Sequence, residues 1–254
     1  MLLAADIGNT NTAIGLYNGE KLAAHWRLTT APNRTADELE IWLRNLLELE
    51  KLTGDDVTGV AISSVVPAIT SVFREVAREI TAGDVVVVGP GTKTSMQINI
   101  DNPREVGADR VVNAVAARER YGAPCVVVDF GTSTNFDVVG VDGDYLGGSI
   151  APGLVIATDA LVSGTAALRN VEFNPPRAAI GKGTVEAIQS GAIYGHAGLV
   201  DGIMERLVAE VGGEVQRVAT GGLATTVVPH CSSVSTIDEF LTLDGLRMIY
   251  EMNQ

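Results

Sequence analysis

Short, continuously apolar runs alternate with amphipathic stretches along the chain. Residues 1–5, 57–66 and 85–88 have the apolar character of buried strands. Residues 36–52 place leucines at helical spacing, and residues 69–80 fit a second helix. Buried strands that alternate with helices predict an α/β fold.

A polar turn follows the first apolar run, at Asp6-Ile7-Gly8-Asn9-Thr10-Asn11-Thr12. Two further strand-like runs are then separated by Asn18-Gly19, and Asn-Gly is the strongest short-range signal for a hairpin. The turn offers N–H groups and hydroxyls to an anion, and Gly8 lets the backbone approach a phosphate closely. Asp6, at the end of the strand, supplies a carboxylate of the kind that a metal ion needs.

The same pattern occurs again about half a chain later. Residues 125–128 are apolar, Asp129-Phe130-Gly131-Thr132-Ser133-Thr134-Asn135 follow, and Asp142-Gly143 marks a second hairpin. One such turn would be ordinary, because Asp, Gly, Asn and Thr are turn formers. Two copies in matching contexts instead predict a duplicated unit, whose two phosphate-binding turns face each other across a cleft.

Another informative stretch precedes the second turn. After Pro103, a helix is predicted to begin near Glu105 and to run toward Tyr121, with Asp109 and Arg110 in its early turns. An acid in a first turn commonly serves the helix dipole. Beside a transferable phosphate, the same carboxylate can accept an alcohol proton. Spacing alone leaves both interpretations of Asp109 open.

Glycine marks the later part of the chain. Residues 146–153 read as a glycine-rich connection, and residues 184–207 as one long helix or a helix pair. Within that helix, Gly191, Gly195 and Gly198 suit either close helix packing or a face that meets a partner subunit.

A Gly-Gly turn follows a predicted strand at 215–219. Gly221-Gly222 can accept a flat ring such as adenine against bare backbone, or it can be a plain strand-to-helix turn. Residues 91–95 and 181–184 lack the glycine spacing of a Walker loop, so a P-loop enzyme is excluded. No Gly-x-Gly-x-x-Gly follows a strand, which argues against the usual dinucleotide fold.

Composition narrows the function classes. The 254 residues carry a formal net charge of −13, which disfavours nucleic acid and anionic membranes as partners. No apolar run is long enough to span a bilayer and no export signal is visible, so we expect a cytoplasmic protein. Cys125 and Cys231 are expected to be reduced and structural, and no catalytic role is assigned to His25, His196 or His230.

Two Asp-x-Gly turns and the late Thr-Gly-Gly resemble the superfamily of acetate kinase, sugar kinases, heat-shock ATPases and actin. This resemblance implies duplicated ribonuclease-H-like domains with a central nucleotide cleft. Within the superfamily, the chain is most similar to type III pantothenate kinase. The segments that carry this similarity, in order along essentially the whole chain, are 6–10, 101–110, 129–132, 147–153, 189–191, 198–202 and 241–246. Gly107-Ala108-Asp109-Arg110 is the most specific of them.

The resemblance implies ATP-dependent phosphorylation of the primary hydroxyl of pantothenate, the first step toward coenzyme A. It implies that residues 6–13 bind ATP phosphates, with Asp6 orienting hydrated Mg²⁺, and that Thr132 touches a phosphate. Asp129 would hold a monovalent cation, K⁺ or NH₄⁺. The residues implied to bind ATP are Asp6, Ile7, Gly8, Asn9, Thr10, Asn11, Thr12, Ala13 and Thr132, to which the Gly221-Gly222 turn is added for adenine.

For pantothenate, the resemblance implies contacts from Gly107, Ala108, Asp109 and Arg110, with Asp109 as the proton acceptor. Thr184 would be a further substrate contact, in a pocket completed at a homodimer interface. We place the two domains at residues 1–117 and 118–254.

The chain departs from the family pattern at four positions. Ser133 and Asn135 stand in the second phosphate turn where a small residue and a threonine are common. Ser95 replaces a usual glycine after Lys-Thr, and Ile100 replaces a tyrosine, which puts one pantothenate contact in doubt. The competing hypotheses are a kinase of the same fold acting on another small hydroxy acid or sugar, and an ATP-binding regulatory protein without turnover.

Overall fold

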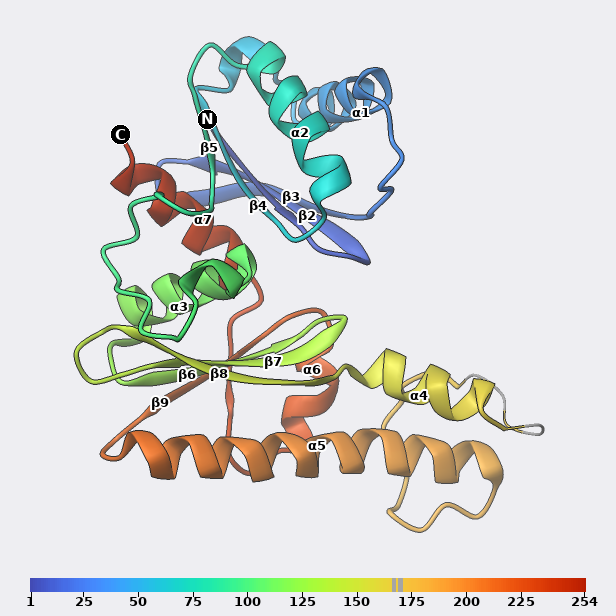
Figure 1. The fold of residues 1–254 in the computed structure, drawn as a ribbon. Coiled ribbons are helices and arrows are strands. Elements are labelled where there is room, and N and C mark those ends of the chain that lie inside the picture. The colour runs from blue at the N-terminus through green and yellow to red at the C-terminus, as the bar shows by residue number, and fades with distance from the viewer. Residues whose placement is uncertain (166–167, 169–170) are drawn as a thin grey trace. The chain divides into compact units, whose positions relative to one another are not determined.

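The computed structural model describes residues 1–165, 168 and 171–254. The chain forms two compact units, each built around a five-stranded sheet (Figure 1). The first unit contains residues 1–96, 102–116 and 242–254, and the second contains residues 97–101 and 117–241. In the part of the chain that is described, no helix is long and apolar enough to cross a membrane.

The first sheet has the order β3-β2-β1-β4-β5. Its strands are β1 (Leu2–Ile7), β2 (Asn11–Asn18), β3 (Lys21–Thr29), β4 (Gly59–Ser64) and β5 (Asp84–Val87). β1, β2 and β3 pair antiparallel, whereas β1, β4 and β5 pair parallel. The hairpin predicted at Asn18-Gly19 is confirmed, and Gly19 has a φ of +58°.

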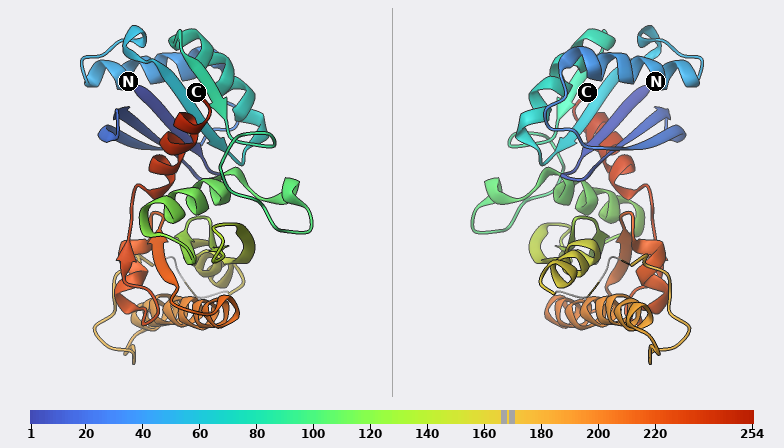
Figure 2. Two further views of the ribbon diagram at one scale, coloured as in Figure 1. Left: turned by 90° about the vertical axis from the view of Figure 1, so that its left-hand side faces the viewer. Right: turned by 90° about the vertical axis from the view of Figure 1, so that its right-hand side faces the viewer.

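Helices α1 (Ala36–Leu49) and α2 (Pro67–Ile80) cover one face of the first sheet (Figures 1 and 2). α1 begins at Thr35, whose hydroxyl accepts from the Glu38 N–H while the Glu38 carboxylate accepts from the Thr35 N–H. A short 3₁₀ turn at Gly54–Asp56 precedes β4. The apolar stripes of both helices pack on alternate residues of the strands, which makes the first core.

The second sheet repeats the first. Its strands are β6 (Cys125–Phe130), β7 (Ser133–Val139), β8 (Tyr145–Pro152), β9 (Gln216–Thr220) and β10 (Thr236–Ile237), in the order β10-β9-β6-β7-β8. β6, β7 and β8 pair antiparallel, and β6, β9 and β10 pair parallel. Reading from β8 gives the same order and directions as the first sheet, so the predicted duplication is confirmed.

Helices α4 (Leu154–Ser163), α5 (Thr184–Val211) and α6 (Ala224–Val227) complete the second unit, with a 3₁₀ turn at Val228–His230. α5 runs along one face of the sheet, with α4 beside its N-terminal half (Figure 1). α5 is one continuous helix, which settles the choice between one helix and a pair.

Residues 145–152 correct one prediction. This segment, expected as a glycine-rich connection, is the strand β8. Its backbone is held along the whole of β7, so paired hydrogen bonds compensate for the weak strand preference of glycine. Gly147, at a φ of +109°, lies where the β7–β8 register shifts, the position at which a bulge favours glycine.

The end of the chain returns to the first unit as α7 (Leu241–Met252). Tyr17 Oη of β2 donates to Asp244 Oδ1 at 2.7 Å, and a Cβ added at Gly245 would clash with the Val112 carbonyl. Our sequence boundary placed residues 118–254 in one domain, whereas the structure groups residues 242–254 with the first unit because these contacts hold α7 there.

Candidate active site

The first polar turn connects β1 to β2. The Gly8 N–H donates to the Asn11 carbonyl at 3.0 Å, and Asn9, Thr10 and Asn11 are exposed. A Cβ at Gly8 would lie 3.1 Å from the Asn11 oxygen, so the turn is tight around this position. The groups at its tip are exposed, and the predicted binding of an anion there stays a prediction.

Thr30 supports this turn from below, and no sequence signal pointed to it. Its hydroxyl donates to the Gly8 carbonyl at 2.7 Å and lies 2.9 Å from the Thr12 hydroxyl. The Thr30 N–H donates to the Thr10 carbonyl at 2.9 Å. Thr12 and Thr30 are both buried, so these bonds fix the turn from the protein side and leave its tip exposed.

Asp6 is the half-buried, penultimate residue of β1. It pairs with Ala13 of β2 on one side and with Ser63 of β4 on the other. Because β1 and β4 run parallel, their carboxyl ends lie at the same edge of the sheet. This edge carries the carboxylate that was predicted to orient a metal ion.

The segment 107–110 begins α3 (Ala108–Tyr121), after a 3₁₀ turn at Pro103–Glu105 that Asn102 caps. α3 therefore begins at Ala108, three residues after the predicted start near Glu105. Asp109 Oδ1 accepts from the Arg110 N–H at 2.9 Å. A Cβ at Gly107 would lie only 2.5 Å from the same oxygen, so a larger residue at this position would displace the Asp109 carboxylate.

Burial raises the pKa of the Asp109 carboxyl above its usual value, although the Arg110 N–H and the Arg110 charge act in the opposite direction. A carboxylate that is poorly solvated is a better proton acceptor than one in water. Burial and the bond from the Arg110 N–H are compatible with a role for Asp109 as a base, which stays a prediction.

Val65 connects the substrate segment to the first turn within this unit. Its N–H donates to the Ile7 carbonyl at 3.1 Å, and its Cγ1 would lie 3.6 Å from a Cβ at Gly107. The structure thereby brings the predicted phosphate turn and the predicted Gly107–Arg110 segment to the same end of the first sheet.

The second polar turn connects β6 to β7, with Gly131 and Thr132 exposed. The Gly131 N–H donates to the Ser133 carbonyl at 3.0 Å. The two departures in this turn bond to each other, because Ser133 Oγ donates to Asn135 Oδ1 at 2.9 Å. The small polar replacements therefore keep the turn closed.

Two glycines from distant segments border this second turn. A Cβ at Gly153, just before α4, would clash with the carbonyls of Gly131 and Thr132. Gly221, at a φ of +92°, leaves no room for a Cβ beside Asp129 Oδ1 and the Phe130 backbone. Asp129 and the Gly221-Gly222 turn are thus neighbours in the second unit.

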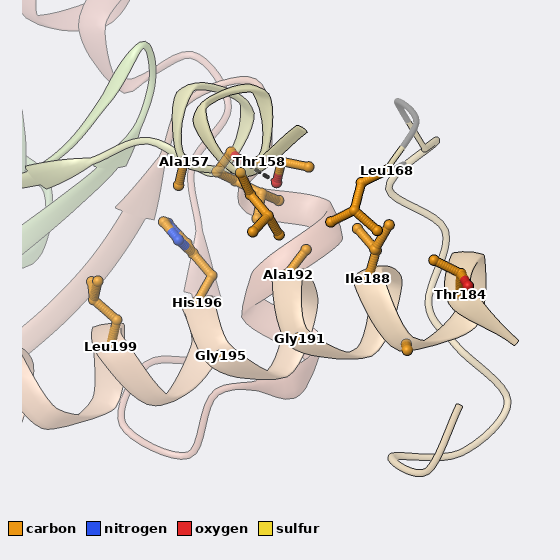
Figure 3. A pocket seen from close by; sticks show the side chains of 13 residues that line it. Ala157, Thr158, Leu168, Thr184, Ile188, Gly191, Ala192, Gly195, His196 and Leu199 are labelled. Carbon is orange, nitrogen blue, oxygen red and sulfur yellow. Dashed lines mark hydrogen bonds between the residues drawn. The ribbon is translucent and has the colours of Figure 1, made fainter. Parts of the chain in front are cut away.

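Thr184 lies elsewhere in that unit, exposed at the first residue of α5. It lines a pocket of about 510 Å³ between α4 and α5, which Figure 3 shows. No other residue of the predicted site lines this pocket. Its wall is mainly apolar, with Ala157 and Thr158 on α4 facing Ala192 and His196 on α5.

His196 joins that pocket to the second turn, which the sequence did not indicate. Its Nε2 lies 2.8 Å from the hydroxyl of Thr134, and both side chains are buried. Burial lowers the pKa of His196, which favours the neutral imidazole. His196 contacts Thr134, next to the turn, and is otherwise a core residue.

The two remaining departures have structural settings. Ser95 has a φ of +51°, a conformation that favours glycine, so the usual glycine at this place has a backbone reason. Ile100 Cγ2 would lie 3.4 Å from a Cβ at Gly147 and thus packs on β8.

Comparison with known proteins gives concordant results. The sequence model of the family described as type III pantothenate kinase matches residues 2–206. The chain is 51% identical to a type III pantothenate kinase of Frankia alni and 48% identical to one of Moorella thermoacetica, with each comparison covering all of both chains.

Solved structures with lower identity share the fold. The activator of 2-hydroxyisocaproyl-CoA dehydratase from Clostridium difficile, with bound ADPNP, has a TM-score of 0.53 at 12% identity, covering 98% of this chain and 94% of that one. A ROK hexokinase from Thermus thermophilus has a TM-score of 0.51 at 15% identity, covering 100% and 99%. The predicted actin-like, duplicated α/β fold is confirmed.

Proposed function

The chain belongs to the type III pantothenate kinase family, and from that premise we propose how its own residues phosphorylate pantothenate. The reaction transfers the terminal phosphate of ATP to the primary hydroxyl of the substrate and is the first step of coenzyme A biosynthesis. The observation that carries the assignment is full-length identity near 50% to named members of the family, together with a family-model match to residues 2–206.

The two polar turns act on ATP. In the first, residues 6–13 offer exposed N–H groups and hydroxyls held in place by Thr12 and Thr30. In the second, Thr132 contacts a phosphate, and the bare backbone of Gly221-Gly222 takes the adenine. The exposure of both turn tips supports these roles.

Asp6 fits a hydrated Mg²⁺. Mg²⁺ keeps several of its waters and uses one or two carboxylates, so it needs no cage of protein ligands. Among the described residues, no group of three His, Cys, Asp or Glu side chains could hold a metal directly, whereas Asp6 stands at the strand end beside the phosphate turn. When bound there, the ion would neutralise charge on the phosphates.

Asp129 is proposed to hold the monovalent cation, K⁺ or NH₄⁺. Its carboxylate oxygen Oδ1 lies close to Gly221. Asp129 is also the register partner of Thr220 on the parallel strand β9. A carboxylate oxygen is a suitable donor for such a hard cation.

Asp109 accepts the proton of the pantothenate hydroxyl, and Gly107 to Arg110 hold the substrate. Phosphoryl transfer has a loose transition state in most analyses, so positioning and charge neutralisation dominate and the proton can leave late. The raised pKa of Asp109 improves it as a base, and the Arg110 N–H bond orients its carboxylate.

Thr184 is proposed to contact substrate in a pocket completed by a second copy of the chain. Exposed apolar side chains occur on α4 and at the start of α5, namely Val155, Ile156, Leu161 and Val185, and Ile180 in the segment before α5 is exposed as well. A Cβ at Gly191 or Gly195 would meet nothing within 4 Å, so these glycines do not serve close packing within the chain. Sedimentation of the purified protein tests the homodimer.

The first experiment is phosphorylation of pantothenate by the purified protein with Mg-ATP, read by mass spectrometry in K⁺ and in Na⁺ buffer. Product formed only with K⁺ would support the kinase and the cation site, which substitution of Asp129 could then locate. Product in both buffers would support the kinase activity and contradict a specific requirement for K⁺. No product in K⁺, Na⁺ or NH₄⁺ buffer, with ATP still bound, would favour another substrate or a regulatory role.

A further inference from the structure

Ser63, the penultimate residue of β4, carries a buried hydroxyl without a hydrogen-bond partner. Its exposed fraction is 0%, and its Oγ has no accessible surface. A hydroxyl that leaves water and gains no partner costs stability, and native proteins seldom retain one without a use. This position therefore calls for a group that the hydroxyl can bond in another state of the protein.

Asp6 is the side chain next to it. Ser63 and Asp6 are register partners on the parallel strands β4 and β1. Side chains alternate along a strand, and both Ile62 and Ile7 belong to the core beneath α1 and α2. Ser63 and Asp6 consequently share the opposite face. Neighbouring strands lie about 4.8 Å apart, a separation that a serine and an aspartate side chain can bridge by rotation.

The next residue of β4, Ser64, has a hydroxyl with hydrogen-bond partners. Ser64 Oγ lies 2.6 Å from the Thr70 hydroxyl and accepts from the Val66 N–H at 3.2 Å. It stabilises the start of α2. Ser64 therefore has a structural use that Ser63 lacks.

We propose that Ser63 is a positioning residue, whose hydroxyl donates to the Asp6 carboxylate in the metal-loaded state and fixes its orientation toward hydrated Mg²⁺. This inference rests on the role proposed above for Asp6. Fixing the carboxylate by a neighbour is the usual way in which a ligand is oriented, and its loss weakens metal affinity. The bond also gives the orphaned hydroxyl its partner when the site is in use.

The test compares binding of the ATP analogue ADPNP with and without Mg²⁺, measured by thermal-shift titration to saturation. The readout is the Mg²⁺ ratio, the factor by which Mg²⁺ lowers the apparent Kd. We expect Ser63→Ala to reduce this ratio about tenfold, as expected for one lost charge-assisted hydrogen bond. The melting temperature of the ligand-free protein should stay unchanged or rise, because the variant removes an unpartnered polar group.

Ser64→Ala is the matched control. It should lower the melting temperature of the ligand-free protein and leave the Mg²⁺ ratio at the wild-type value. A Ser63→Ala protein that keeps the wild-type ratio, whether or not its melting temperature falls, would overturn the inference.

Asp6→Asn separates this inference from the function on which it rests. If Mg²⁺ no longer strengthens ADPNP binding in Asp6→Asn and strengthens it less in Ser63→Ala than in the wild type, the proposed roles of Asp6 and Ser63 are both supported. Loss in Asp6→Asn with a wild-type ratio in Ser63→Ala removes only the role of Ser63. A wild-type protein in which Mg²⁺ has no effect on ADPNP binding would overturn the role of Asp6 and this inference together.

Discussion

Asp109 combines a raised pKa with a defined orientation, which are the two properties that a carboxylate base needs. We predict that Asp109→Asn reduces turnover roughly 10² to 10⁴-fold while ADPNP binding changes little. Steady-state kinetics and the thermal-shift titration measure the two quantities. Asp101→Asn, at an exposed position earlier in the same stretch of sequence, should keep turnover near the wild-type value. Near wild-type turnover in Asp109→Asn would exclude this residue as the base.

The same carboxyl predicts the pH dependence of the reaction. Burial raises its pKa, and only the ionised form can accept the substrate proton, so kcat/KM should fall as the pH drops through that raised value. A pH profile of kcat/KM checks this. If the residual activity of Asp109→Asn showed the same fall in kcat/KM at low pH, that fall would have to be assigned to another titrating group.

Folding stability should depend on pH in the opposite sense to activity: ionisation of Asp109 enables catalysis but lowers the stability of the fold. Because the folded state raises this pKa, folding takes up a proton between the ordinary value near 4 and the raised value. Ionised Asp109 therefore costs stability above this window. The Asp109→Asn protein should melt at the same or a higher temperature than wild type at neutral pH, and a clearly lower melting temperature would contradict the assignment of burial as the cause.

At the scale of single residues, the sequence predicted where some features of the site lie, whereas the roles of the site residues stay predictions. The exposed tips of the two turns and the position of Asp109 early in its helix follow from motif and spacing. The hydrogen bond from Thr30 to Gly8 and the pairing of Ser63 with Asp6 could not be predicted, because each joins residues that are far apart in the sequence. The contact between His196 and Thr134 could not be predicted either, because it joins residues 62 positions apart.

Among the elements, α1 ends in a motif that departs from the ideal at one residue. Lys51 has a φ of +60°, its N–H donates to the Glu48 carbonyl and the Leu52 N–H donates to the Leu47 carbonyl, the two bonds of a Schellman motif. Glycine relieves the left-handed strain but costs more entropy on folding, so Lys51→Gly should stabilise the protein by about 0.5–1 kcal/mol.

Chemical denaturation measures that difference. Glu50→Gly is the control, because Glu50 has a φ of −93° and gains nothing from glycine. This control should be neutral or destabilising. If both substitutions changed stability equally, the backbone explanation for Lys51 would be wrong.

α5 is tied to the loop after the Val228–His230 turn by one carboxylate. Asp201 accepts from the N–H groups and hydroxyls of Ser232 and Ser233, at 2.6 to 3.0 Å. Burial acts to raise the pKa of Asp201, but these bonds outweigh it and lower the pKa. We predict that Asp201→Ala destabilises the protein by about 1–3 kcal/mol, since two N–H groups lose their acceptor.

The pH dependence of stability distinguishes this carboxylate from its neighbours. Because the folded-state pKa is lowered, the stabilisation is present above the unfolded value near 4 and is lost as the pH falls toward the folded value. Asp201→Ala should therefore flatten the acid limb of the melting temperature against pH. Glu205→Ala, exposed on the same helix, should leave that limb intact.

Elements with strong local signals were predicted well. The hairpins at Asn18-Gly19 and Asp142-Gly143 and the helix near residues 69–80 follow from turn chemistry and periodicity. β8 was missed, because its glycines carry no strand signal and its conformation depends on pairing with β7. The glycines within α5 likewise left two possibilities open in the sequence, one helix or a pair. The structure has a single helix, which packs along the second sheet.

For the whole molecule, the duplication was visible because two motifs recur in matching contexts, and the repeated strand order confirms it. The sequence did not indicate to which of the two units the last helix belongs. α7 has an apolar stripe in which Leu243, Leu246 and Ile249 are almost fully buried. Such a stripe predicts that the helix packs on a core, but it does not predict which of the two cores. The first unit is therefore incomplete until residues 242–254 have been synthesised.

That arrangement predicts the effect of a truncation after Leu241. Burying each of the three apolar side chains contributes about 1.5–3 kcal/mol, so the missing helix removes an amount comparable with the stability of a domain. Trp26 and Trp42, the two tryptophans of the sequence, both lie in the first unit, so tryptophan fluorescence reports on that unit alone. The truncated chain should lose its cooperative fluorescence transition. It should keep helical circular dichroism from the long α5 of the second unit. A chain lacking only the exposed Gln254 should behave as wild type, and a truncated chain with a wild-type fluorescence transition would show that α7 is dispensable to the first unit.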